Sequence, residues 1–186
     1  MGSLLQNEVV ILRGLEPEDL EFLYQCENNP QIWTVSNTLV PYTRYVLKQY
    51  IADSQLDIYT TKQLRLIIAS AEKPEIPVGA IDLFDFDPYH QRAGVGILIH
   101  QESDRGKGFA FYALTLLMEY CFQHLHLHQL YCNITADNSK SIALFEKAGF
   151  KKCGIKKDWI KTANGWLDER MFQAVKPIDI PHAPFK

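Results

Sequence analysis

Apolar residues along the 186-residue chain fall into two recurring patterns. Runs rich in Val, Ile and Leu, bounded by Gly, Pro, Asn or Asp, predict strands. These runs cover residues 8–13, 64–69, 78–86, 93–100, 128–136, 154–159 and 166–174. Apolar residues at helical spacing predict helices between them. The predicted helices begin at residue 16, cover 45–55, follow a glycine-containing loop at 104–110, and cover 137–147.

Turn residues indicate how the predicted strands are joined. Lys73-Pro74 and the segment 87–91 separate three successive strands, which should form an antiparallel meander. Asn164-Gly165 between the last two runs is the strongest short hairpin signal in the chain. Residues 31–43 lack a clean period and contain Pro41, so a loop with exposed aromatic residues is expected. Such a loop either walls a pocket or packs as a lid without a ligand role.

The central feature is the strand 93–100, followed by Asp104-Arg105-Gly106-Lys107-Gly108-Phe109-Ala110 and an apolar helix. Gly106 and Gly108 permit positive φ, so backbone N–H groups can turn toward one point where the helix begins. These groups and the helix dipole favour an anion such as phosphate. The spacing matches neither GxxxxGK[ST] nor GxGxxG, because Phe111 replaces the third glycine. The loop therefore indicates a different phosphate site, or a plain turn between a strand and a helix.

Composition narrows the class of protein. A hydrophobic content of 47% suits one compact domain over residues 1–186, with 177–186 as a C-terminal tail. The formal net charge of −3 argues against a nucleic-acid partner. No apolar run approaches the roughly 20 residues that a membrane-spanning helix needs. No nucleic-acid or membrane partner is therefore expected.

Cysteine usage indicates a reducing compartment. The four cysteines lack CxxC spacing, and no signal-peptide pattern precedes them. Reduced thiols in a cytoplasmic protein are expected, with Cys121 and Cys153 in the core. The four positions are Cys26, Cys121, Cys132 and Cys153.

A second motif follows the strand 128–136, namely Asn138-x-x-Ser141-x-x-x-Phe145-x-Lys147-x-Gly149-Phe150. Together with the RGKGFA loop it resembles the GCN5-related N-acetyltransferase (GNAT) superfamily, whose cofactor site combines a [RQ]-x-x-G-x-[GA] loop with a later N-x-x-[AS]-x-x-x-[YF]-x-K-x-G-F helix. Leu12-Arg13 and Leu15-Glu16-x-x-Asp19-Leu20 resemble the opening of the bacterial spermidine and diamine acetyltransferases and of the ribosomal-protein acetyltransferases. The resemblance covers nearly the whole chain. It implies an α+β (mixed α/β) fold, with a mostly antiparallel twisted sheet of six or seven strands, about four flanking helices and a splayed strand pair.

The resemblance also implies acetyl-CoA as the co-substrate. The loop backbone would hold the CoA pyrophosphate, and strand 93–100 would pair with the pantetheine arm. Asn138 would contact the cofactor or cap its helix, and Lys147 would reach the phosphates or simply suit the helix dipole. The implied backbone contacts are Arg105, Gly106, Lys107, Gly108, Phe109 and Ala110 in the loop, and Ile97, Leu98 and Ile99 in the strand.

The implied reaction is acetyl transfer to a primary amine, with polyamines or diamines such as spermidine placed first. A protein or peptide N-terminus is the second acceptor, and a CoA-binding module with little catalysis is the alternative from another class. An alkylamine has a pKa near 10.4, so a base must take a proton before attack. Asp82 and Asp85 are the candidates. Only one of them is expected to act, because residues three apart on a strand cannot both face one cleft without a bulge. Asp82 is favoured over Asp85. Weaker candidates are Glu102, Tyr131 and Asp168.

The chain departs from the family pattern at two positions. Phe145 occupies the place of the tyrosine that usually protonates the leaving thiolate, and it has no proton to give. We expect slower transfer rather than none, with Ser141 as a possible source of a hydroxyl through water. Gly94 stands where the spermidine enzymes tend to have a glutamate, and the segment 34–43 lacks their acidic run. Both differences weaken the assignment of a polyamine as the acceptor.

Other polar and aromatic features have simpler explanations. The alternating histidines should lie on the surface, and no metal site is expected. The tryptophans would line the acceptor pocket or pack in the core and the last hairpin. An exposed aromatic hairpin would be compatible with a homo-oligomer. The histidines are His124, His126 and His128, and the tryptophans are Trp33, Trp159 and Trp166.

Overall fold

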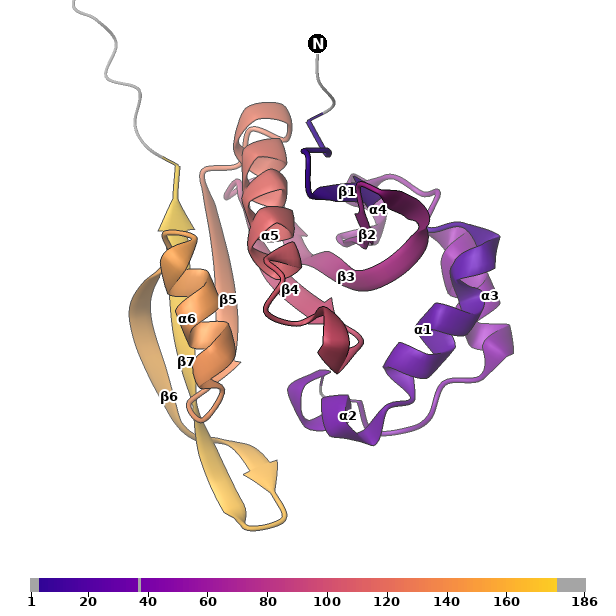
Figure 1. Ribbon diagram of the computed structural model, residues 1–186. Helices are drawn as coiled ribbons and strands as arrows, with labels where there is room; N and C mark the ends of the chain where they lie inside the picture. Colours follow the sequence, from indigo (N-terminus) through magenta and orange to yellow (C-terminus); the bar gives the residue numbers. More distant parts are fainter. Residues whose placement is uncertain (1–3, 37, 177–186) are drawn as a thin grey trace, which may run out of the picture.

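The computed structural model describes residues 4–36 and 38–176, and its strands form one seven-stranded sheet in the order β1-β2-β3-β4-β5-β7-β6 (Figure 1). Every neighbouring pair is antiparallel except β4 and β5, which are parallel. This confirms the predicted mixed fold, including the meander formed by β2, β3 and β4. The strands are β1 (Val10–Arg13), β2 (Leu64–Ser70), β3 (Lys73–Asp87), β4 (Arg92–Ile99), β5 (Gln129–Thr135), β6 (Lys151–Thr162) and β7 (Gly165–Val175). The tail predicted at 177–186 lies outside the described residues.

The described part of the chain contains six α-helices, two more than the sequence predicts. The helices are α1 (Leu20–Glu27), α2 (Pro30–Ser36), α3 (Arg44–Asp53), α4 (Ile58–Thr61), α5 (Phe109–Glu119) and α6 (Ser139–Lys147). Short 3₁₀ turns cover Pro17–Asp19 and Glu102–Asp104, and a π-helical turn at Tyr120–His124 extends α5. The loop predicted over 31–43 is wrong at its start, because α2 begins at Pro30. Proline suits the first position of a helix, where its missing N–H has no partner to lose.

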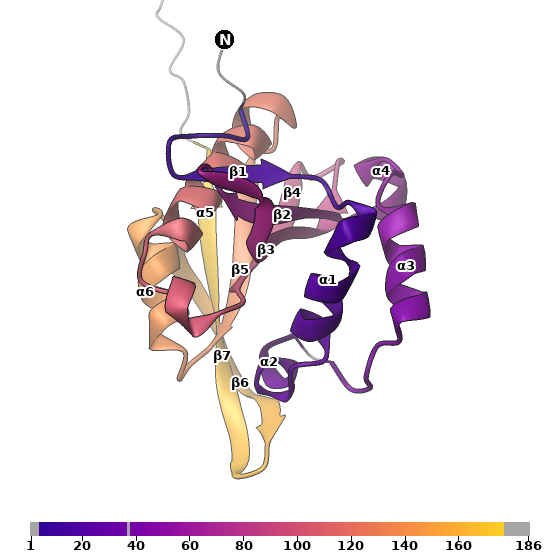
Figure 2. The ribbon, with the colours of Figure 1, turned by 45° about the vertical axis from the view of Figure 1, so that its right-hand side comes forward.

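The helices cover the sheet on both faces (Figure 2). One face carries α5 and α6, and its core includes Leu114 of α5 and Phe145 of α6. The other face carries α1 and α3, whose Leu23 and Leu47 pack against Ile67 of β2. Side chains alternate between faces along a strand, so each central strand contributes to both layers. The strand β4 therefore directs side chains both toward the layer that contains α1 and toward the layer that contains α5.

The strands β4 and β5 pair only over their first residues. Their registered pairs run from Arg92 with Gln129 to Gly94 with Tyr131. Beyond Gly94, β4 continues to Ile99 while β5 continues to Thr135, and the two strands no longer pair. This confirms the splayed pair that the resemblance implies. It leaves alternate backbone N–H and C=O groups of β4 open on the side that faces β5.

Local details of the fold confirm one prediction and correct another. The last hairpin is present, and because Thr162 pairs with Gly165 its two-residue loop is 163–164. Cys153 is exposed on the edge strand β6 and is not a core residue, whereas Cys121 is fully buried. Burial raises the pKa of the Cys121 thiol to about 12, which keeps it neutral.

The opening motif of the chain has a structural role. Arg13 on β1 donates two hydrogen bonds to the carboxylate of Asp19, at 2.7 and 2.8 Å. Asp19 is only 3% exposed and also accepts from the backbone N–H of Glu16 at 2.9 Å. This ion pair fixes the end of β1 to the start of α1. None of the helices in residues 4–36 and 38–176 is long and apolar enough to cross a membrane.

Candidate active site

The glycine loop has the backbone shape that an anion site needs. Gly106 and Gly108 have φ of 80° and 89°, in the left-handed region that favours glycine. Gly108 is the N-cap of α5, so the first N–H groups of this 11-residue helix point out of its end. A Cβ at Gly108 would lie 3.1 Å from the ring of Tyr112. The loop is therefore a close backbone turn at a helix N-terminus, and a role in holding phosphate stays a prediction.

Positive side chains surround this helix end. Arg105 donates weakly to the carbonyl of Ile99 at 3.4 Å, which ties the loop to the end of β4. Lys107 pairs with Asp104 at 2.8 Å and is exposed. The Nζ of Lys147, at the end of α6, lies 4.4 Å from the ring centroid of Phe111 in the first turns of α5. The two sequence motifs thus meet at one place.

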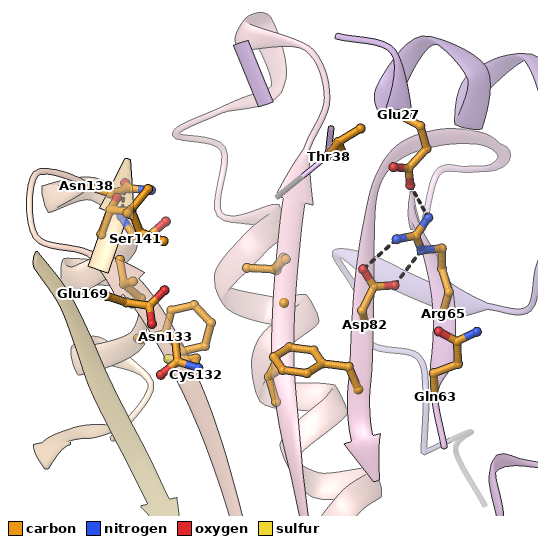
Figure 3. A pocket seen from close by; sticks show the side chains of 18 of the residues that line it. Glu27, Thr38, Gln63, Arg65, Asp82, Cys132, Asn133, Asn138, Ser141 and Glu169 are labelled. Atoms are coloured by element: carbon orange, nitrogen blue, oxygen red, sulfur yellow. Dashed lines mark hydrogen bonds and ion pairs between the residues drawn. The ribbon is translucent and has the colours of Figure 1, made fainter. Parts of the chain in front are cut away.

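A cavity of about 540 Å³ opens where β4 and β5 diverge (Figure 3). One side is formed by β5, β7 and α6, and the other by α1, β2 and β3, with β4 between them. Figure 3 shows Cys132, Asn133, Asn138, Ser141 and Glu169 on the first side and Glu27, Arg65 and Asp82 on the second. The cavity therefore joins the groove beside β4 to a charged chamber under α1.

Three residues of the second motif line the cavity. The side chain of Asn138 accepts from the N–H of Ser141 at 3.1 Å, which confirms its role as the N-cap of α6. Ser141 is half-buried, and Phe145 follows one turn later. Phe145 is 3% exposed and packs edge-to-face on Phe150 with ring centroids 5.0 Å apart. A role for Asn138 in holding the cofactor stays a prediction.

The structure separates the two carboxylates that the sequence proposes as bases. Asp82 lines the cavity, whereas Asp85 is exposed outside it and accepts from the O–H of Tyr131 at 3.1 Å. Asp85 has a φ of 49°, and the β3–β4 register shifts between Phe84 and Asp87. Even with this irregularity, only Asp82 of the two faces the cavity.

Arg65 joins two acidic residues in the chamber, and sequence reasoning missed both it and Glu27. Its Nε and Nη2 donate to the two oxygens of Asp82 at 2.6 and 3.0 Å, and its Nη1 donates to Glu27. Burial disfavours the charge on Arg65, but the Asp82 carboxylate outweighs this effect and raises the pKa of the guanidinium above its ordinary value. Arg65 and Asp82 are registered partners on β2 and β3. Each is a charged residue within an otherwise apolar strand, and this was the sequence signal that could have indicated a paired site.

Glu169 is a second missed carboxylate. It is 8% exposed on β7, lines the cavity and accepts from the Nζ of Lys156 at 2.7 Å. Its neighbour Asp168, a weaker candidate from the sequence, instead accepts from Lys157 at 2.7 Å. Adjacent residues on a strand face opposite sides of the sheet, so Glu169 faces the cavity and Asp168 faces away from it.

The other candidates do not line the cavity. Glu102 is exposed at the start of a 3₁₀ turn, and Tyr131 is bound to Asp85. Burial, together with the charge of Asp85, raises the pKa of Tyr131 to about 12. Trp33 donates to the carbonyl of Glu27 at 2.8 Å, outside the cavity lining.

The remaining tryptophans and the histidines that the sequence analysis singled out are exposed. Trp159 and Trp166 are 56% and 59% exposed on the last hairpin, so they neither line the pocket nor pack in the core. The three histidines at 124–128 are exposed. No group of three or more potential metal ligands occurs among residues 4–36 and 38–176.

The cavity lining includes one cysteine, a residue type that acts as a nucleophile when it is deprotonated. Cys132 on β5 lines the cavity and is only 1% exposed. Burial raises the pKa of its thiol to about 12. A thiol rather than a thiolate is therefore present at neutral pH, so the site favours direct transfer over a covalent cysteine intermediate.

Comparison with known proteins decides the family. Residues 10–151 match the family described as the acetyltransferase (GNAT) domain. The chain belongs to this family. It is 29% identical over 151 residues to the spermidine N(1)-acetyltransferase of Vibrio cholerae serotype O1, covering 80% of this chain and 82% of the relative. It is 32% identical over 145 residues to that of Escherichia coli strain K12, covering 76% and 72%.

A solved structure confirms the fold. The crystal structure of spermidine N-acetyltransferase from Vibrio cholerae in complex with CoA and spermine superposes with a TM-score of 0.80 and 24% identity, covering 91% of this chain and 96% of that one. This GNAT chain is accordingly an acetyl-CoA-dependent N-acetyltransferase. Its residues fit the co-substrate, because the left-handed glycines leave a helix end open and β4 has an unpaired edge.

Proposed function

We propose that this GNAT enzyme transfers the acetyl group of acetyl-CoA to a primary amine of an aliphatic polyamine or diamine such as spermidine. The observation that carries the proposal is the chamber beneath α1, where the carboxylates of Glu27 and Asp82 line the same cavity as the splayed part of β4. An ammonium group needs such acidic partners when it leaves water. The spermidine acetyltransferases among the relatives support this class of acceptor.

The proposed reaction has three parts. A base takes a proton from the acceptor ammonium, and the neutral nitrogen then attacks the thioester carbonyl carbon. A C–N bond forms and the C–S bond breaks, the nitrogen loses its second proton as the amide forms, and the thiolate takes up one proton to leave as CoA. Backbone N–H groups on the open edge of β4 are suited to polarise the carbonyl as negative charge develops on its oxygen. The products are the N-acetylated amine and free CoA.

Asp82 is the proposed proton acceptor, with Glu27 beside it. Arg65 contacts both oxygens of Asp82 but only one oxygen of Glu27. This pairing holds the carboxylates in place on the wall opposite α6. Ser141, rather than Phe145, is the proposed source of a hydroxyl near the leaving sulfur, acting through water. The loop backbone at 105–110, the strand backbone at 97–99, Asn138 and Lys147 are the proposed CoA contacts.

The test is CoA release from acetyl-CoA, read with a thiol reagent. The acceptors are putrescine, spermidine, spermine and a panel of peptides with free N-termini. Turnover with the polyamines and not with the peptides is the expected result. Turnover restricted to peptides would instead establish a protein N-terminal acetyltransferase.

One observation favours a second candidate, a CoA-binding protein with little catalysis. Phe145 is buried at the position of the usual acid, so the ordinary proton donor is missing. Tight acetyl-CoA binding without CoA release across the whole panel would support this candidate. A gain of turnover in the Phe145→Tyr variant would then establish that the rest of the site is competent.

We also propose a cytoplasmic homo-oligomer. The last hairpin carries the exposed residues Trp159 and Trp166, and β6 forms an edge of the sheet. Exposed apolar surface beside a free edge favours association with another copy. Light scattering after size exclusion would measure the mass, and Trp159→Ser should shift the species toward monomer.

A further inference from the structure

The charges that line the cavity nearly cancel. Within the described residues, the charged side chains of the lining are Glu27, Arg65, Asp82 and Glu169. Arg65 neutralises one of the two acids in its cluster, and Lys156 neutralises Glu169 at 2.7 Å. One uncompensated negative charge remains, and it lies in the chamber beneath α1. A cavity with one net negative charge matches one ammonium group.

An aromatic ring occupies the wall beside this cluster. Phe84 lines the cavity, and a Cβ on Gly94 of the adjacent strand would lie 2.2 Å from its ring. Gly94 is therefore a glycine because the Phe84 ring covers it. The same ring packs edge-to-face on Tyr131, with centroids 6.0 Å apart. This wall is fixed as apolar surface and has no room for a carboxylate on Gly94.

Further apolar space lies on the other side of the charged cluster. A smaller cavity of about 170 Å³ shares Glu27, Arg65 and Asp82 with the main one. Its remaining walls are mostly apolar, formed by Leu23, Cys26, Ile32, Ala80, Gly96, Ile97 and Leu98. The charged cluster thus stands between two apolar surfaces.

We propose that the cavity accepts one ammonium group at the Glu27–Arg65–Asp82 cluster and packs an apolar segment of the acceptor beside it. Arg65 and Phe84 are then the specificity-determining residues. This inference rests on the proposed acetyl transfer to a primary amine and shifts the preferred acceptors from polyamines toward diamines and monoamines. Amines with one ammonium, or with ammonium groups separated by a long alkyl spacer, are preferred. Spermine, whose ammonium groups are closely spaced, is the poorest acceptor.

The physical reason lies in the second ammonium group. In a closely spaced polyamine this group must also enter the cavity, whose described lining offers it the Arg65 guanidinium and no second unpaired carboxylate. An unpaired charge in such a place is costly, and like charges repel. A long diamine such as cadaverine can leave its second ammonium in water and bury its methylene groups.

The first experiment compares acceptors with the unaltered enzyme. Values of kcat/KM are measured for hexylamine, cadaverine, spermidine and spermine at saturating acetyl-CoA. We expect cadaverine to exceed spermine by about tenfold or more, and hexylamine to be turned over. Equal or better turnover of spermine overturns the inference and leaves the proposed function standing. If no amine is turned over while acetyl-CoA still binds, both the inference and the proposed function are overturned.

The second experiment adds the missing carboxylate. Phe84→Glu places a negative charge on the apolar wall, and Phe84→Gln is a matched control of equal size without charge. The ratio of kcat/KM for spermine to that for cadaverine should rise by about tenfold in Phe84→Glu relative to Phe84→Gln. Equal ratios in the two variants would mean that the wall does not select by charge. An acetyl-CoA thermal shift verifies that both variants are folded.

Discussion

The two halves of the site are built in different ways. On the proposed cofactor side, contiguous backbone supplies the geometry: a glycine loop, the N-terminus of α5 and the open edge of β4. On the acceptor side, the chamber depends on side chains from three separate elements, Glu27 of α1, Arg65 of β2 and Asp82 of β3. Backbone geometry tolerates many side chains, whereas a charge cluster changes with each substitution. We infer that the first half fixes the donor and the second half fixes the acceptor.

The largest expected effect comes from blocking the backbone site. Gly108→Asp places a side chain at a φ of 89° and brings a negative charge to the helix end. Left-handed strain and repulsion of phosphate should together weaken acetyl-CoA binding by about 100-fold or more. Isothermal titration with acetyl-CoA measures this change.

A matched control is available at Gly14. This glycine is exposed and lies away from the loop, and a Cβ added to it would have no neighbouring atom within 4 Å. Gly14→Asp should leave the dissociation constant for acetyl-CoA unchanged. If Gly108→Asp binds acetyl-CoA as well as Gly14→Asp does, the cofactor side is not built on this loop.

The second largest effect is expected from a substitution on the acceptor side. Asp82→Asn removes one charge from the cluster with Arg65 while keeping the size of the side chain. Its kcat/KM for the amine should fall by about 100-fold, because the proton acceptor is lost, while acetyl-CoA affinity is kept. Asp85→Asn, outside the cavity, should have an effect at least tenfold smaller. Equal losses in the two variants would contradict the assignment of Asp82.

This difference between the halves also explains what the sequence could predict. The glycine loop, the helix after it and the Asn138-to-Phe150 motif are local, and the structure brings them together as the resemblance implies. The splayed strands follow from the same resemblance and are confirmed by the pairing of β4 and β5. Local patterns were therefore sufficient for the fold, while the individual residues of the cofactor side stay predictions.

The acceptor side was harder because its contacts are long-range. Glu27 lies at the end of a helix, and only the tertiary packing of α1 over β2 brings it to Arg65. Glu169 and Asp168 are neighbours in sequence, and the strand register alone decides which one faces the cavity. Each error concerns a residue whose role depends on distant partners.

Phe145 of α6 lines the cavity on the side opposite the Glu27–Arg65–Asp82 cluster, and it tests the protonation of the leaving thiolate. Phe145→Tyr restores a phenolic O–H that can protonate the leaving thiolate. We expect kcat to rise by about tenfold, less than the roughly 10²–10⁴-fold typical of general acid catalysis, because the proposed Ser141 relay already supplies a proton. Stopped-flow CoA release at saturating substrates measures this change. An unchanged kcat, with the variant folded, would mean that thiolate protonation does not limit the rate.

The smallest expected effect belongs to a side chain on the cofactor side. Lys147→Gln keeps most of the length of the side chain and removes the charge that lies 4.4 Å from the Phe111 ring. An exposed charge of this kind contributes little, so the dissociation constant for acetyl-CoA should rise only about threefold. Lys161→Gln, exposed on β6 near the end of the last hairpin, is the matched control and should have no effect. A loss from Lys147→Gln as large as that from Gly108→Asp would show that side-chain charge, rather than backbone, dominates CoA binding.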